Sequence, residues 1–225
     1  MIYAENIYIA LAGPMLFSLM LMRGQARRTV FFLLCGMTAS LLSAYLNSFG
    51  AAASDITADQ ASLLISPLGD EVLKLLPVLF YVLLLEPRRQ DILSSALTVG
   101  LGFTLFENSC YIVLFGSEDL LYMLLRGFST GAMHTVCSAV TGFGLTFLGR
   151  RHWPALVSTV GMLSLAATYH AVYNLLVLQT GAARSIGYAL PFVTGLALAA
   201  ALRDSPSGWV LGKRGGIQNF FQSWW

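Results

Sequence analysis

Long apolar stretches separated by short polar connectors run along almost the whole chain of 225 residues. A helix needs about 20 apolar residues to cross the roughly 30 Å of hydrocarbon in a bilayer. Seven stretches of that kind are present, near residues 2–22, 30–50, 63–85, 92–115, 120–149, 154–178 and 185–202. The pattern predicts an all-α polytopic membrane bundle of about seven transmembrane helices. The connectors are too short to hold a soluble domain.

The charges of the connectors alternate in sign along the chain. Arginines stand at 23–28, 88–89 and 150–151, and acids stand at 55–59 and 118–119. Because short loops rich in Lys and Arg stay on the cytoplasmic side, we expect the N-terminus outside and the C-terminus in the cytoplasm. The first stretch has no basic n-region before its apolar run, unlike a secretory signal peptide, and is expected to stay as the first helix.

The composition agrees with a protein whose solvent is the bilayer. Residues are 56% hydrophobic and only 11% charged, against about 25% charged in soluble domains. The net charge of +2 without a basic cluster gives no indication of nucleic-acid binding. We therefore expect one transmembrane domain, 1–202, and a cytoplasmic or interfacial tail, 203–225, whose Trp, Phe and basic residues suit the headgroup region.

Charged residues interrupt the third apolar stretch, where Asp70, Glu71 and Lys74 lie close together. Each charge at the centre of a spanning helix costs roughly 2.5–3.5 kcal/mol on the insertion scale. Lys74 follows Asp70 by four residues and Glu71 by three, so it can neutralise one of the acids on the same helix face. The second carboxylate is then left over, which suits a general base or acid.

The next three stretches also carry polar residues. They are Glu107 and Asn108, then Arg126 and His134, then His170 and Asn174. Ionisable residues inside membrane helices usually mark functional sites. Arg126 has two equally good interpretations, since it can extend toward the headgroups or pair with a carboxylate. Gly100 and Gly102 allow another helix to approach closely near Glu107.

A depth estimate places most of these groups in one layer. With a rise of 1.5 Å per residue, Glu71 lies about 12 Å below the outer end of its span, and Glu107 and His170 lie about 10 Å below theirs. His134 lies about 20 Å deep if its span begins at residue 120. We expect the groups to converge in the outer half of the membrane, with His134 somewhat deeper.

Four motifs in order carry a resemblance to a known family. The segments PLGDEVLK, FTLFEN, MH and HAVYN, between residues 63 and 178, resemble the PrsW family of intramembrane proteases, distant relatives of the type II CAAX prenyl endopeptidases. The family motif EExxK aligns with Asp70, Glu71 and Lys74, and the motif FxxxEN aligns with Phe103, Glu107 and Asn108. The third motif, a single histidine, aligns with His134, and the motif HxxxN aligns with His170 and Asn174. Asp70 replaces the first glutamate of the family motif.

The resemblance implies site-1-type proteolysis of a membrane-anchored protein, such as an anti-sigma factor, in a prokaryotic cytoplasmic membrane. The partners would be that substrate and the lipid bilayer. The related prenyl endopeptidases have a histidine where this chain has Glu107, so cleavage of prenylated peptides is less expected here.

Two mechanisms use the same residues. In the preferred, metal-free mechanism, Glu71 is the general base, His134 helps to hold the water, and His170 with Asn174 stabilises the oxyanion. Glu107 would orient groups or share protons, and Lys74 would tune the two acids beside it. In the rival mechanism, His134, His170 and Glu107 bind zinc and Glu71 deprotonates the bound water. The sequence has no HExxH motif, which favours the metal-free version.

Two other classes of protein fit the same buried charges. A proton-coupled transporter or ion pathway also places acids and histidines inside helices, but the chain shows no internal repeat of the kind many transporters carry. A catalytically inactive relative that serves as a membrane scaffold is the third alternative, and the replacement by Asp70 mildly favours it.

Overall fold

The computed structural model describes residues 4–116, 120–148 and 153–203. These residues form eight helices and contain no strand, which confirms the predicted all-α class. The helices are α1 (Ala4–Leu21), α2 (Gly24–Ser54), α3 (Ala58–Leu64), α4 (Ser66–Leu85), α5 (Arg89–Phe115), α6 (Leu120–Leu145), α7 (Trp153–Leu178) and α8 (Ala182–Arg203). The predicted tail, from residue 204 onward, lies outside the described residues.

Five of these helices are long and apolar enough to cross a membrane: α1, α2, α5, α7 and α8. This supports an α-helical membrane bundle but falls short of the seven predicted spans. The two other long helices are α4 and α6. Helix α4 holds Asp70, Glu71 and Lys74 within 20 residues, and α6 holds Arg126 and His134. The two long helices that are not apolar enough to be identified as spans are therefore the ones that carry much of the predicted site.

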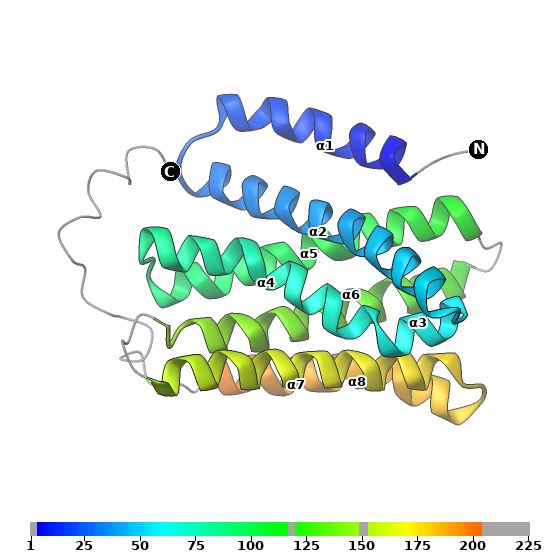
Figure 1. The fold of residues 1–225 in the computed structure, drawn as a ribbon. Helices are drawn as coiled ribbons and strands as arrows, with labels where there is room; N and C mark the ends of the chain where they lie inside the picture. The colour runs from blue at the N-terminus through cyan, green and yellow to red at the C-terminus, as the bar shows by residue number, and fades with distance from the viewer. Residues whose placement is uncertain (1–3, 117–119, 149–152, 204–225) are drawn as a thin grey trace.

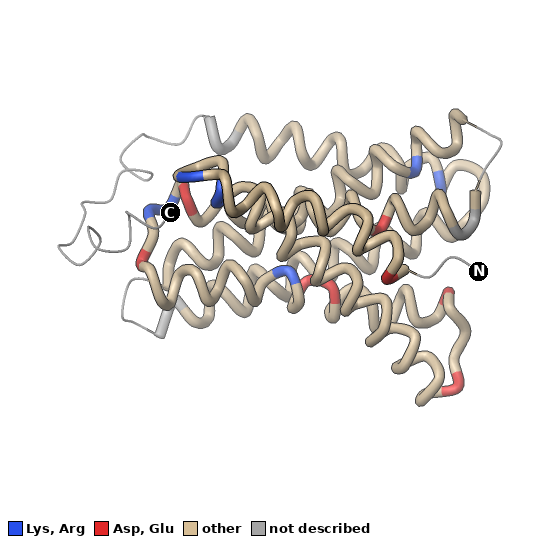
Figure 2. The backbone as a smooth tube through the Cα atoms, turned by 90° about the horizontal axis from the view of Figure 1, so that it is seen from above, with Lys and Arg blue, Asp and Glu red and all other residues tan. Residues whose placement is uncertain are grey.

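The long helices lie side by side in an elongated bundle, with α1 along one flank and α7 and α8 along the opposite one (Figure 1). The most extensive packing is between α2 and α5, followed by α5 with α6 and then α6 with α7, while α4 contacts all four of these helices. Charged residues gather toward the two ends of the bundle, and one mixed group of acids and bases lies between them (Figure 2).

The short helix α3 lies at one end of the bundle, where it contacts α2, α4 and α7. Its start is fixed by a capping box, in which Thr57 accepts from the Gln60 backbone N–H and Gln60 accepts from the Thr57 backbone N–H. Seven residues are too few for a stable isolated helix. The cap and the neighbouring helices therefore hold α3 at this end of the bundle.

Glycines allow the closest helix crossings. A Cβ atom added at Gly36 would collide with the backbone of Val99, and one added at Gly102 would collide with the backbone of Leu33, so α2 and α5 touch backbone to backbone. A Cβ at Gly100 would collide with the side chain of Ser138 on α6. The expected close approach at Gly100 and Gly102 is therefore present, as is typical of small residues between membrane helices.

Gly102→Ala is expected to lower the free energy of unfolding by about 1–3 kcal/mol, because a methyl group here forces two backbones apart. Thermal unfolding of the purified protein in detergent measures the effect. The matched control is Gly161→Ala on α7, where a Cβ atom has no neighbour within 4 Å. Equal shifts for the two variants would contradict the tight crossing.

Candidate functional site

Helix α4 carries three charged residues in its first half, all turned toward the interior. Asp70 is 6% exposed, Glu71 0% and Lys74 2%. Pro67 stands at the start of the helix, where its missing N–H costs nothing. The four long helices around α4 then enclose the face that bears the charges. Such burial requires partners for every charge.

Lys74 connects the acids of α4 to the histidine of α6. Its Nζ atom lies 2.6 Å from Glu71 Oε1 and 3.1 Å from His134 Nδ1. Of the two neighbouring acids, Glu71 is the one that receives this close ion pair. Asp70 is thus the second acid, and it depends on other partners.

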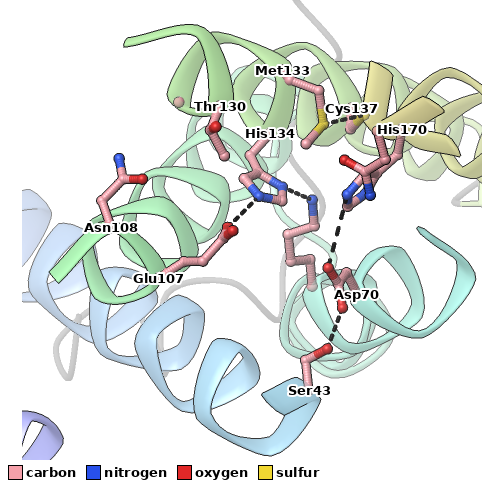
Figure 3. A network of polar contacts seen from close by, with 12 residues as sticks. Ser43, Asp70, Glu107, Asn108, Thr130, Met133, His134, Cys137 and His170 are labelled. Atoms are coloured by element: carbon pink, nitrogen blue, oxygen red, sulfur yellow. Dashed lines mark hydrogen bonds and ion pairs between the residues drawn. The ribbon is translucent and has the colours of Figure 1, made fainter. Parts of the chain in front are cut away.

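His134, on α6, lies between Lys74 and Glu107. Its Nε2 atom is 2.7 Å from Glu107 Oε2, and Figure 3 shows the ring pointing at that carboxylate. An ammonium group only donates hydrogen bonds, so Nδ1 must accept from Lys74 and Nε2 carries the proton that is donated to Glu107. The network therefore assigns the Nε2–H tautomer to a neutral His134.

His170, on α7, completes the cluster. Its Nδ1 atom lies 3.0 Å from Glu71 Oε1, and its Nε2 atom lies 4.0 Å from Asp70 Oδ2. The rings of His134 and His170 meet edge to face with centroids 5.1 Å apart. Side chains from α4, α5, α6 and α7 thus form one continuous network.

The contacts also revise the depth estimate. His134 touches Glu107 and Lys74 directly, so it lies at the level of the other groups and not about 10 Å deeper. Helix α6 does begin at Leu120. The difference arises because neighbouring helices are staggered and tilted, which a count of residues along one helix ignores.

Arg126 pairs with a carboxylate inside the bundle and does not extend toward the headgroups. Its Nη2 atom lies 3.7 Å from Glu107 Oε1, and its Nη1 atom donates to Asn108 Oδ1 at 3.2 Å. The guanidinium carbon lies 3.3 Å from the centroid of the Tyr111 ring, a cation–π arrangement. Asn108 in turn donates to the Gly127 carbonyl at 3.2 Å, so it holds Arg126 and α6 in place.

Asn174 lies one turn after His170 on α7 and lines the same cavity. Its Nδ2 atom donates to the backbone carbonyl of Ser62 on α3 at 2.8 Å. No hydrogen bond joins Asn174 and His170 within the described part of the chain. Asn174 thereby ties α7 to the short helix at the end of the bundle.

Two residues of α2 belong to the site although no motif pointed to them. The Ser43 hydroxyl donates to Asp70 Oδ1, and Figure 3 shows this contact below the histidines. Asn47 Nδ2 lies 3.1 Å from Ser43 Oγ and 3.4 Å from Asp70 Oδ1. The only signal in the sequence was the spacing of Ser40, Ser43 and Asn47 on one helix face, which is common in membrane helices.

A cavity of about 610 Å³ opens beside the cluster, lined by residues from α2 through α8. Five predicted site residues line it: Asp70, Glu107, Arg126, His170 and Asn174. Glu71, Lys74 and His134 are not among the lining residues. Glu107 has 34% of its side chain exposed, whereas Glu71 has none. Of the acids predicted for the site, Asp70 and Glu107 therefore line the cavity and Glu71 does not.

A set of potential metal ligands lies within the same cluster. Glu71, His134 and His170 each offer one ligand atom, and these three atoms lie within 4.8 Å of one another. The acid in this group is Glu71, whereas the sequence had suggested Glu107. Glu71 Oε2 is buried and has no hydrogen-bond partner among the described residues.

A helical membrane bundle that gathers acids, histidines and an arginine around an internal cavity has the features of an intramembrane hydrolase. The chain matches the PrsW family intramembrane metalloproteases over residues 24–201 and belongs to this family. It is an integral membrane protein of a protease family. No curated protein and no solved structure gives a significant match.

Proposed function

We propose that this protein is an endopeptidase that cleaves membrane-anchored proteins inside its own helical bundle. The observation that carries the proposal is the cavity, because its lining includes Asp70, Glu107, His170 and Arg126 within an apolar bundle. Peptide hydrolysis needs a base for water, a positive group for the oxyanion and an acid for the leaving amine. The cavity lining offers each of these.

Glu107 is the proposed general base. It lines the cavity, it is the more exposed of the two glutamates, and His134 Nε2 donates to its Oε2 atom. Glu107 takes a proton from water as the hydroxyl oxygen bonds to the scissile carbonyl carbon. It then returns this proton to the amine nitrogen as the C–N bond breaks. Arg126, 3.7 Å from Glu107, is placed to stabilise the oxyanion.

Glu71, the base assigned from the sequence, receives a supporting role in this proposal. It is fully buried and is the counter-ion of Lys74. Lys74 fixes the tautomer of His134, and His134 fixes Glu107. Glu71 and Lys74 thus act through His134 on the carboxylate that meets the substrate, in the way outer groups orient a catalytic histidine.

The family description names a metal, and the donor types of Glu71, His134 and His170 are those that zinc prefers. However, the Lys74 ammonium already lies between Glu71 Oε1 and His134 Nδ1. A divalent ion at these donors would share two of its three ligands with a fixed positive charge a few ångströms away, which is repulsive. The described residues therefore do not fit a resident zinc ion, and the proposed reaction uses no metal.

The expected substrate is a single-pass membrane protein, with an anti-sigma factor in a prokaryotic cytoplasmic membrane as the first candidate. Glu71 lies about 8 Å along α4 from its first residue, Ser66. The connector charges predict that this end of α4 lies outside the cell. Cleavage would then occur in the outer half of the membrane, near the boundary of the substrate's own helix.

Co-expression with a panel of single-pass proteins tests the proposal. Glu107→Gln is expected to reduce processing by about 10²–10⁴-fold, the usual contribution of a general base. Asp55→Asn is the matched control, since this acid caps α2 in the left-handed region that asparagine tolerates and does not line the cavity. Unchanged processing in Glu107→Gln would contradict the assigned base. Proton flux in liposomes with no cleavage of any panel member would instead favour a transporter.

A further inference from the structure

One acid that lines the cavity belongs to none of the sequence motifs. Asp59 stands on the short helix α3, and its residue is exposed, so a molecule in the cavity can reach it. Ala58 and Ser62, which lie one turn apart on α3, line the cavity as well. Because these two neighbours have small side chains, the carboxylate of Asp59 is the charged group that this wall of the cavity offers.

Helix α3 holds this carboxylate at a fixed place in the bundle. The capping box of Thr57 and Gln60 fixes the start of the helix, and Asn174 of α7 donates to the Ser62 carbonyl at 2.8 Å. Asn174 follows His170 by four residues, which is about 6 Å along α7. Asp59 lies nearly one further turn along α3, so it stands roughly 10 Å from the level of His170.

The charges of the cavity lining are not balanced. The lining includes three acids, Asp59, Asp70 and Glu107, and one arginine, Arg126. Arg126 lies 3.7 Å from Glu107, and Asp70 accepts hydrogen bonds from side chains of α2. Asp59 forms no ion pair with any residue that the structure describes. A cation on a bound molecule would therefore find its free counter-ion at Asp59.

The expected cation is a side chain of the substrate, since the substrate chain is what must enter this cavity. We infer that Asp59 selects substrates that carry a lysine or arginine near the scissile bond, on the side where α3 lies. The inference rests on the proposed function and names a substrate class for it. An extended chain advances about 3.3 Å per residue, so roughly 10 Å places the basic residue about three residues from the scissile bond.

A purely structural role for Asp59 predicts something different. An acid in the first turn stabilises a helix through the helix dipole. If Asp59 did only this, its loss would affect all substrates alike. If Asp59 binds a basic residue, its loss affects only substrates that carry that residue, and a reversed charge at position 59 reverses the preference.

Synthetic single-pass peptides with an apolar segment of about 20 residues test the inference. One lysine is moved residue by residue along an otherwise uncharged peptide, and binding is measured with the Glu107→Gln protein, so that no peptide is consumed. We expect lysine at one position to strengthen binding about three- to tenfold over glutamine there, and the gain to shrink as salt is raised. Adding Asp59→Asn should abolish the gain, and adding Asp59→Lys should transfer it to glutamate at the same position.

Two controls complete the experiment. Asp59→Glu keeps the charge and should keep the lysine preference, and so should Asp55→Asn, since Asp55 does not line the cavity. A lysine preference that is the same with and without Asp59, no gain for glutamate in Asp59→Lys, or no binding of any peptide would overturn the inference. Cleavage by the unsubstituted protein regardless of peptide charge contradicts this inference alone. Charge reversal in binding without cleavage of any peptide contradicts the proposed function alone.

Discussion

Lys74→Met is expected to destabilise the protein by about 3–5 kcal/mol, because it leaves the Glu71 carboxylate buried without its counter-ion. Glu71 has no exposed surface, and its Oε1 atom lies 2.6 Å from Lys74 Nζ. Oε1 would keep only the hydrogen bond from His170. Methionine fills a similar volume, so the loss comes from the charge and not from a cavity. Thermal unfolding in detergent at neutral pH measures the difference.

The double variant Glu71→Gln, Lys74→Met is expected to recover most of this loss, since it removes both charges together. Arg88→Met is the matched control. Arg88 and Asp91 also form an i,i+3 pair at 2.9 Å, but the arginine side chain is 46% exposed. Exposed pairs of this kind contribute at most about 1 kcal/mol. If Lys74→Met cost no more than Arg88→Met, the buried ion pair would not be a main support of the cluster.

The sequence was sufficient to predict the helical bundle, since apolar stretches of about 20 residues have few other stable forms. Helix α3 was missed, because its seven residues give no periodic pattern and its Asp59 was assigned to a connector. The sequence predicted about seven spans, but only five of the described helices are long and apolar enough to cross a membrane, for a physical reason. Helix α4 carries three charged residues, Asp70, Glu71 and Lys74, and α6 carries Arg126 and His134 together with several glycines, serines and threonines.

The sequence also predicted which helices contribute to the cluster of buried polar groups, because buried charges are costly wherever they lie. It did not predict which acid faces the cavity. Asp70 and Glu71 are adjacent, and a rotation of about 100° of α4 separates them, which only the packing of neighbouring helices can fix. Ser43 and Asn47 could not be recognised either. Small polar residues on a membrane helix cost little, so they leave no anomaly in the pattern.

Zinc binding by this protein is expected to depend on the Lys74 side chain. Purified protein is expected to retain substoichiometric zinc and to keep processing its substrate after treatment with a chelator. The reason is that the Lys74 ammonium lies 2.6 Å from Glu71 and 3.1 Å from His134, two of the three potential zinc ligands. Zinc analysis of the purified protein and a processing assay measure both parts of this prediction.

Lys74→Met is then expected to gain zinc affinity, because Glu71, His134 and His170 become a His₂Glu site without a competing cation. Zinc at about 100 times its Kd would raise the stability of this variant by about 2.7 kcal/mol, and a further His134→Ala change would remove the effect. Stoichiometric zinc in the unsubstituted protein, with processing lost to chelator and restored by zinc, would show the opposite. Lys74 would then have to move away from both ligands, and Glu107, hydrogen-bonded to His134, would become an outer carboxylate that orients a zinc ligand.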